Sequence, residues 1–279
     1  MPRGSSVSDS RIRLRTAVVG HVEWVEFVRV DRVPLPGEIV TAGESWEEPA
    51  GGGGVAAVRL ARLAGACTFF TALGEDRLGR RAQAELEALG VTVRAVFRPE
   101  PQRRAFTYVD RTGERTITVV HEKMHPRRSE PLPWEELAGF DAVYFCAGDP
   151  GALRAARAAR VLVATARELP TLADAGVELD ALVASAHDPS ESYERGRLDP
   201  EPRLVVRTAG AAGGTYEPGA GSWPAAEAPG PLADTYGAGD SFAAGLAYGL
   251  GAGLPVDDAL ALAARCGAEA LTRRGAHGR

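Results

Sequence analysis

The chain has little lysine and little cysteine. Lys123 is the only lysine among 32 basic side chains, so a lysine clamp is missing from any phosphate site. The three cysteines, Cys67, Cys146 and Cys266, stand far apart in apolar segments. An odd count without metal-ligand spacing excludes a disulfide framework and indicates buried thiols in a reducing compartment.

The chain also lacks a strong charge of one sign and a long apolar run. Its net charge of -5 gives no electrostatic basis for binding nucleic acid or an anionic membrane. The polar, basic start from Met1 to Arg15 is neither a signal peptide nor a membrane span. We expect a disordered tail over residues 1–14, one domain over 15–279 and a cytoplasmic location.

Short apolar runs alternate with helical patterns along the chain. This alternation predicts a mostly parallel sheet with helices on both faces, because parallel strands need crossover connections. The predicted strands are Thr16–Val19, Cys67–Ala72, Ala142–Cys146, Val161–Ala164, Ala181–Ala184 and Leu204–Arg207. The predicted helices are Val55–Leu63, Leu78–Leu89, Ala152–Ala159, Leu169–Ala175, Ser241–Leu250 and Val256–Leu271.

Two regions break this alternation and predict a small projecting sheet, a candidate lid. Strand patterns at Glu23–Val33 and Glu38–Trp46 surround a Pro34–Gly37 turn. A second pair, Phe106–Asp110 and Arg115–Val120, flanks a hairpin signal. The lid strands then span about 22–46 and 104–120. Ala209–Gly230 predicts a loop around one short strand.

The most informative stretch is Asp234–Gly245, which reads Asp-Thr-Tyr-Gly-Ala-Gly-Asp-Ser-Phe-Ala-Ala-Gly. A glycine turn that begins a helix presents unpaired amides and the positive end of the helix dipole, which suit an anion. Asp240 stands beside that turn and is well placed to take a proton from an attacking hydroxyl. The alternative is that Asp240 is only a helix N-cap.

A second glycine run, Pro49–Gly54, precedes a predicted helix. It is either a flexible connection or a backbone surface that a substrate approaches closely.

Two other motifs can be set aside. His121–His125 spells His-Glu-x-x-His, but it follows a strand pattern and Pro126 disfavours helical geometry at His125, so a zinc site is not expected. P-loop and dinucleotide-binding signatures are absent.

These motifs together resemble the ribokinase or phosphofructokinase-B family of carbohydrate and nucleoside kinases. The resemblance runs from Val18 to Gly275 and rests on the Asp234–Gly245 signature together with Pro36–Glu38, Gly51–Gly65, Ala72–Asp76, Gly113–Thr116 and Thr208–Gly210. It implies a ribokinase-like three-layer α/β/α sandwich with a β-sheet lid. It also implies ATP and Mg²⁺, with a monovalent cation such as K⁺ in some members.

The resemblance also implies roles for particular residues. Asp240 matches the catalytic base, and Gly237, Ala238 and Gly239 match the anion hole. The implied nucleotide-binding residues are Thr208, Gly210, Ala264, Gly267 and Ala268, and the implied metal-site residues are Asp188, Asp234 and Thr235. For substrate binding we select Glu23, Gly51, Gly52, Gly53 and Arg104.

The departures from the family pattern concern the substrate. Val25 stands where the family usually has a hydroxyl-binding Asp, and Val55 or Ala56 where it has Asn. Four nearby residues are either substitute ligands for the substrate or surface residues of the lid, namely Glu23, Glu26, His21 and Trp24. Gly53 stands where sugar-phosphate kinases often have Lys. The pair Arg103 and Arg104 is either another positively charged clamp for a phosphate or part of a solvent-exposed face.

The sequence therefore predicts an ATP-dependent kinase that phosphorylates a hydroxyl of a small sugar, polyol or nucleoside-like substrate. The alternative is a non-catalytic nucleotide or metabolite sensor derived from the kinase fold. We expect a homodimer through the lid, because exposed lid strands leave edges that need covering.

Overall fold

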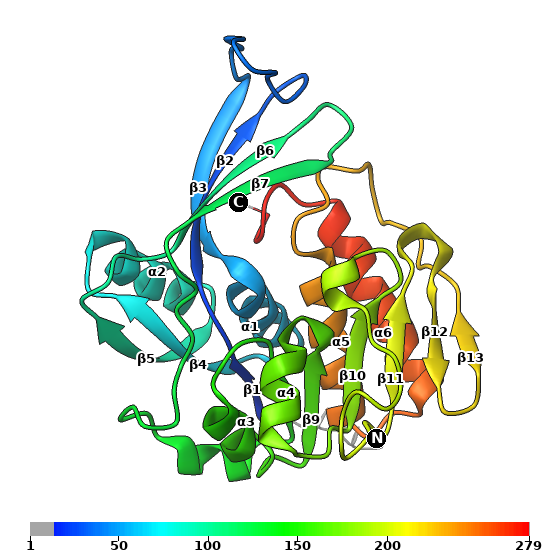
Figure 1. Ribbon diagram of the computed structural model, residues 1–279. Helices are drawn as coiled ribbons and strands as arrows, with labels where there is room; N and C mark the ends of the chain where they lie inside the picture. The colour runs from blue at the N-terminus through cyan, green and yellow to red at the C-terminus, as the bar shows by residue number, and fades with distance from the viewer. Residues whose placement is uncertain (1–13, 279) are drawn as a thin grey trace, which may run out of the picture.

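The structure is a computed structural model that describes residues 14–278. The predicted disordered tail therefore lies outside the described residues, except for Leu14, which is buried. The nine strands of the large sheet run in the order β13-β12-β11-β10-β9-β8-β1-β4-β5 (Figure 1). Seven of them are parallel, and β12 and β13 are antiparallel additions at one edge. The bounds are β1 Thr16–Val19, β4 Cys67–Gly74, β5 Val91–Arg98, β8 Ala142–Phe145, β9 Val161–Thr165, β10 Ala181–Ser185, β11 Val205–Thr208, β12 Gly214–Glu217 and β13 Gly221–Trp223.

Helices cover both faces of this sheet, which confirms the predicted three-layer arrangement. Side chains alternate along each strand, so Val18 and Phe69 face one layer while Val19 and Phe70 face the other. The first layer holds α1 Gly51–Ala64, α2 Arg77–Ala88, α5 Ala238–Gly251 and α6 Val256–Leu271. The second holds α3 Pro150–Ala156, α4 Leu169–Ala175 and the short 3₁₀ helix η1 Trp134–Gly139.

A separate four-stranded sheet forms the predicted lid. Its order is β3-β2-β6-β7, with bounds β2 Glu23–Arg29, β3 Glu44–Ala50, β6 Arg104–Val109 and β7 Arg115–Val120. It projects away from the large sheet, and the C-terminal segment lies beneath it (Figure 1). One face buries Val25, Phe27 and Ala105 against Tyr236, which lies just before α5.

Several predicted bounds are corrected. The second lid strand begins at Glu44 rather than Glu38, because Arg32 binds Glu38 and holds the tip as a loop. β5 was not predicted, because Val91–Arg98 lies at the edge of the large sheet and contains polar residues, so it is not the continuous apolar run expected of a buried parallel strand. The 209–230 segment contains two short strands, β12 and β13, where one was predicted.

Candidate active site

Helix α5 begins at Ala238, three residues before its predicted start. Gly237 is the N-cap residue, with φ of +73°, a conformation that favours glycine. Asp240 therefore lies in the first turn and is not the N-cap. The first amides of an α-helix have no partner within the helix, so those of the Gly237–Gly239 segment are available to an anion.

The Asp240 carboxylate faces the first turn of α1. The glycine run is helical, since α1 begins at Gly51 rather than Val55. A Cβ atom added to Gly52 would lie 2.9 Å from Asp240 Oδ1, and the Gly51 amide donates to Tyr236 Oη at 3.2 Å. The two helix N-termini therefore meet at Asp240, and glycine at position 52 leaves room for its carboxylate.

Burial raises the pKa of Asp240 to about 6, and the neighbouring charge of Glu191 adds to this shift. The positive charges of Arg167 and Arg115 oppose it. With a pKa near 6, most Asp240 side chains are ionised at pH 7, yet the carboxylate remains a stronger base than an ordinary aspartate. This combination suits a general base.

Glu23 and Arg104, both predicted to bind substrate, lie on different faces of the lid. Arg103 Nε donates to Glu23 Oε1 at 2.7 Å, and Gly51 packs against Glu23. Arg104 pairs instead with Glu26 and lies over Phe106. Residues 24, 26 and 104 share the face that α2 approaches, since Arg81 lies over Trp24. Arg103 is therefore the arginine that faces the glycine run.

The residues at the two substituted hydroxyl-binding positions pack into protein. Val25 is fully buried in the cluster with Phe27 and Tyr236, and Val55 packs against Gly237. His21 lies beside Gly51 and Gly53, and its Nδ1 atom is buried and has no hydrogen-bond partner in the described part of the chain. Burial, followed by the charges of Lys123 and Arg103, holds the pKa of His21 well below its usual range.

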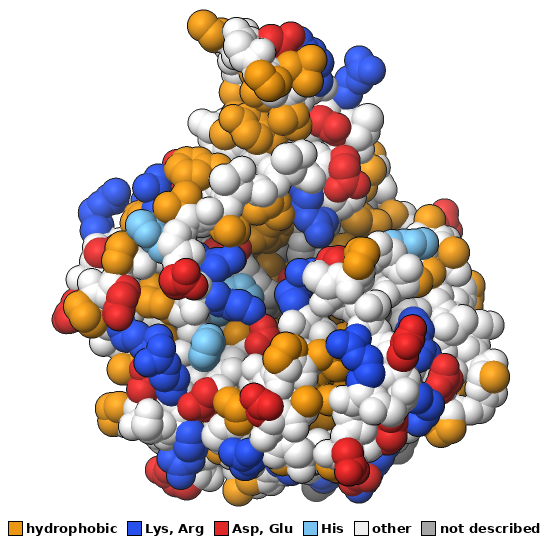
Figure 2. Space-filling model, in the orientation of Figure 1, with side chains coloured by type: hydrophobic (Ala, Val, Ile, Leu, Met, Phe, Trp, Pro, Cys, Tyr) orange, Lys and Arg blue, Asp and Glu red, His pale blue; other side chains and the backbone are white. Residues whose placement is uncertain are grey.

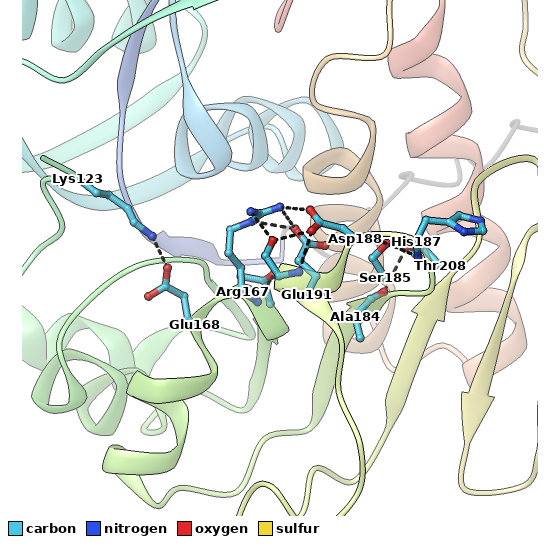
Figure 3. Close-up of polar contacts among 11 residues, drawn as sticks. Lys123, Arg167, Glu168, Ala184, Ser185, His187, Asp188, Glu191 and Thr208 are labelled. Atoms are coloured by element: carbon cyan, nitrogen blue, oxygen red, sulfur yellow. Dashed lines mark hydrogen bonds and ion pairs between the residues drawn. The ribbon is translucent and has the colours of Figure 1, made fainter. Parts of the chain in front are cut away.

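Charged side chains gather where β9 and β10 end. Arg167 donates to Asp188 at 2.8 Å through Nη2 and to Glu191 at 2.9 Å through Nε, and Lys123 binds Glu168 at 2.5 Å (Figure 3). On the face shown in Figure 2, the molecule is hollowed beneath the lid, and Lys, Arg and His side chains surround the hollow. Parallel sheets carry their sites at the carboxyl ends of strands, and Arg167 lies two residues beyond the end of β9. That position was the signal by which Arg167 could have been found from the sequence.

A cavity of about 460 Å³ lies on the other side of the α5 N-terminus. The structure brings all five predicted nucleotide-binding residues to its wall, together with Thr235, Ala238 and Gly239. Trp223 and Phe242 stack with ring centroids 5.6 Å apart and add an apolar surface. Trp223 in β13 was not predicted to contribute, because the 209–230 segment was predicted to be a loop around one short strand of unspecified bounds.

The predicted cation ligands Asp234 and Thr235 already have hydrogen-bond donors. Asp234 is fully buried and accepts from the Tyr236 amide at 2.9 Å and the Gly275 amide at 2.6 Å. Arg115 Nη1 donates to the Thr235 carbonyl at 2.6 Å and to its hydroxyl at 3.1 Å. Burial raises the pKa of Asp234 above its ordinary value.

The His121–His125 segment is not helical, as the position of Pro126 predicted. Its two histidines therefore do not share the helical face that a His-Glu-x-x-His metal site requires. Within residues 14–278, no cluster of three His, Cys, Asp or Glu side chains is arranged to hold a metal ion.

The three cysteines are buried and free, as expected. No helix in the same range is long and apolar enough to cross a membrane.

Comparisons with known proteins agree with this architecture. Residues 14–278 match the model of the pfkB family carbohydrate kinases. The ATP-dependent ribose-1-phosphate kinase of Halopiger xanaduensis is 30% identical, and the alignment covers 94% of each chain. A microbiome-derived acarbose kinase superposes with a TM-score of 0.79 at 24% identity, covering 96% of this chain and 95% of that one. Ribokinase from Cryptococcus neoformans, solved with ADP, gives a TM-score of 0.71 at 24% identity, covering 95% and 96%. The chain belongs to the pfkB family of carbohydrate kinases, phosphotransferases whose acceptor is a hydroxyl group.

Proposed function

We propose that this protein transfers the γ-phosphoryl group of ATP to a hydroxyl of a small sugar or sugar-like substrate, with Asp240 as the general base. The observation that carries the proposal is the position of Asp240. It lies at the N-terminus of α5, between the cavity lined by Thr208 and Ala264 and the glycine turn of α1. A nucleotide on one side and an acceptor hydroxyl on the other would then meet at this carboxylate.

In this mechanism the acceptor oxygen attacks the γ-phosphorus as its O–H bond breaks. The new O–P bond forms, the bond between the γ-phosphorus and the bridging oxygen breaks, and ADP leaves. The proton passes to an Asp240 carboxylate oxygen. The amides of Gly237, Ala238 and Gly239 would stabilise negative charge on the transferred group, since they are preorganised donors at a helix N-terminus.

The cavity is the proposed nucleotide site. Thr208 is the last residue of β11, Gly210 follows it, and both would lie along the phosphates. Ala264, Gly267 and Ala268 on α6 would form the wall of the adenine pocket. Small side chains on this wall leave room for a flat ring, and the apolar surface of Trp223 suits stacking. The ADP complex of the Cryptococcus ribokinase supports a nucleotide in this fold.

The residues present also fit a hydrated Mg²⁺ ion. Glu191 binds Arg167 through Oε1, which leaves acceptor capacity at Oε2. Asp188 accepts from Ser190 at Oδ1 and from Arg167 at Oδ2, so it would act on the ion through water. Mg²⁺ keeps several waters and takes few protein ligands, which suits such a site. When bound, the ion would neutralise charge on the nucleotide phosphates.

The substrate class that we favour is a phosphorylated pentose. The Halopiger relative is named a ribose-1-phosphate kinase. In this chain the charges of Lys123, Arg103 and Arg167 all act on the neutral His21 ring beside the glycine run, so the single lysine lies near this site, contrary to the expectation from composition. Each cation has a carboxylate partner, so a bound phosphate would share its donors with Glu23, Glu168 or Asp188.

The test is a panel assayed for ADP release with ribose, ribose 1-phosphate, ribose 5-phosphate, polyols and nucleosides. We expect turnover with at least one substrate, and Asp240→Asn should lower kcat by about 10²- to 10⁴-fold while retaining ATP binding. Asp258→Asn, an exposed acid in the first turn of α6, is the matched control. Near-normal turnover of Asp240→Asn would refute the mechanism. Tight ATP binding without turnover on any substrate would favour the sensor.

Arg103→Gln separates the substrate classes. If Arg103 contacts a substrate phosphate, the variant should raise KM for the phosphorylated sugar about tenfold or more and leave KM for an unphosphorylated sugar nearly unchanged. Arg104→Gln is the control, because Arg104 lies on the other face of the lid. Equal effects of Arg103→Gln on both substrates would argue against a phosphate-binding role.

A further inference from the structure

The loop before α5 has the oxygen atoms that a monovalent cation requires, but protein donors already bind them. Such a cation is held by carbonyl and carboxylate oxygens that replace its water shell. Here each Asp234 carboxylate oxygen accepts a backbone amide. The Thr235 carbonyl and hydroxyl both accept from Arg115, and the Ala233 carbonyl accepts from Arg29 at 3.2 Å. The residues therefore do not fit a bound K⁺ ion.

The guanidinium of Arg115 is itself a cation placed on the lid. Arg115 is the first residue of β7, directly after the turn at Gly113. The Gly113 carbonyl accepts from the Thr235 amide at 3.0 Å, so the turn contacts the same loop through its backbone. Glu114 Oε1 accepts from the Thr235 hydroxyl at 3.2 Å. Thr235 is thus held at its amide, carbonyl and hydroxyl by one lid hairpin.

Thr235 also lines the cavity, two residues before the N-cap Gly237. A cation that fixes the Thr235 carbonyl therefore fixes the path of the chain into the first turn of α5. We propose that Arg115 takes the place of a monovalent cation in this protein. It is a positioning residue that couples the lid hairpin to the anion-binding turn and makes nucleotide binding independent of K⁺.

The experiment measures ATP affinity by calorimetry in tetramethylammonium chloride and in KCl at equal ionic strength. The wild-type Kd should agree within about twofold between the two salts, whereas Arg115→Ala should weaken binding about tenfold in tetramethylammonium. Millimolar guanidinium or KCl should restore most of that loss, because either cation can enter the vacated position. Arg111→Ala removes the same charge from the exposed turn of this hairpin and should leave the Kd unchanged.

Three results would overturn the proposal. These are a wild-type affinity that rises fivefold or more with K⁺, an Arg115→Ala protein that behaves like Arg111→Ala, and a loss that neither cation restores. The proposal rests on the proposed function only for the identity of the nucleotide. Failure of that function is distinguishable, because a protein that binds ATP without turnover still shows the effect of Arg115→Ala on Kd, whereas a protein specific for another nucleotide binds no ATP in either salt.

Discussion

Asp240 combines two demands on one carboxylate. As the proposed general base it must be ionised to accept a proton, and it lies where burial and Glu191 disfavour its charge. A pKa of about 6 meets both demands at neutral pH, because the ionised form dominates there and its basicity is higher than usual. The fall in kcat on the acid side of the pH profile, its acid limb, should therefore follow the protonation of Asp240.

The first prediction concerns that limb. Between pH 8 and pH 5 we expect kcat to fall with an apparent pKa of about 6, since protonation removes the base. A pH profile of kcat at saturating ATP and substrate measures it. An acid limb near pH 4 would mean that the Asp240 carboxyl is not shifted.

The second prediction concerns stability. The pKa of Asp240 is higher in the folded protein than its ordinary value of 3.8, so folding favours the protonated form. This contribution is fully present below pH 4 and is lost as the pH rises through 6. Asp240→Asn should therefore raise the free energy of unfolding at pH 7.5, by at most roughly 2 to 3 kcal/mol because the residue is partly exposed. The difference should vanish near pH 4, and thermal unfolding at both pH values tests it. A gain of equal size at both would contradict it.

At two positions where the family usually has asparagine, this chain has another residue, and its overall composition accounts for that. The whole chain contains no asparagine. One of these positions belongs to the family's Asn-x-x-Glu metal-phosphate motif, which corresponds to Ser185–Asp188 in this chain. Ser185 Oγ accepts from the His187 and Asp188 amides at 3.2 and 3.1 Å. Its hydroxyl orders the turn that presents Asp188, so a local structural role is retained there without the amide.

At the scale of elements, the first turn of α1 shows why a glycine run can be helical. Gly51 has φ of +76°, and Gly53 packs within 2.6–2.9 Å of the His21 backbone as judged from an added Cβ. These contacts allow α1 to approach β1 and β2 closely. A run that reads as a flexible connection is therefore a close-packed helix start.

The third prediction uses this geometry. Gly52→Ala places a methyl group 2.9 Å from Asp240 Oδ1, so the carboxylate must move. We expect kcat to fall about 10- to 100-fold, while stability stays level or rises by up to about 1 kcal/mol, because alanine favours a helix. Gly54→Ala is the control, since its added Cβ has no neighbour closer than 3.8 Å. Kinetics and thermal unfolding of both variants distinguish a displaced base from a damaged helix, and loss of stability in Gly52→Ala would point to the latter.

At the scale of the whole molecule, the projecting lid sheet exposes several apolar side chains. Strand β7 is at the edge of the lid sheet, and Ile117 and Val119 on it are 41% and 47% exposed. Leu35 and Ile39 at the tip are 63% and 100% exposed. Exposed edges and apolar side chains on a projecting sheet favour association with a second copy.

The fourth prediction follows from that surface. In solution the protein should have twice the mass of one chain, and Ile117→Asp with Val119→Asp should give a monomer. Thr118→Asp, on the opposite face of β7, should leave the dimer intact. Light scattering after size exclusion measures all three proteins, and a monomeric wild type would end the dimer hypothesis.

Local sequence patterns were enough to predict the layers of the fold and the family. Apolar runs such as Thr16–Val19 and helical patterns such as Val256–Leu271 predicted their elements at the observed bounds, because periodicity is a local property. The Asp234–Gly245 signature indicated the family, since a glycine turn, a helix start and an acid are adjacent in the chain.

Which side chains face one another depends on the packing of segments that are distant in the chain. Pairing of β2 with β6 placed Arg103 toward the glycine run and Arg104 on the far face, and a strand reverses its side chains at each residue. Arg167, Arg115 and Asp240 lie far apart in the sequence, and only the packing of β9, the lid and α5 brings their charges together. The same packing gave Asp234 and Thr235 protein donors, because hydrogen-bond partners distant in the chain are set by the fold and not by the local pattern.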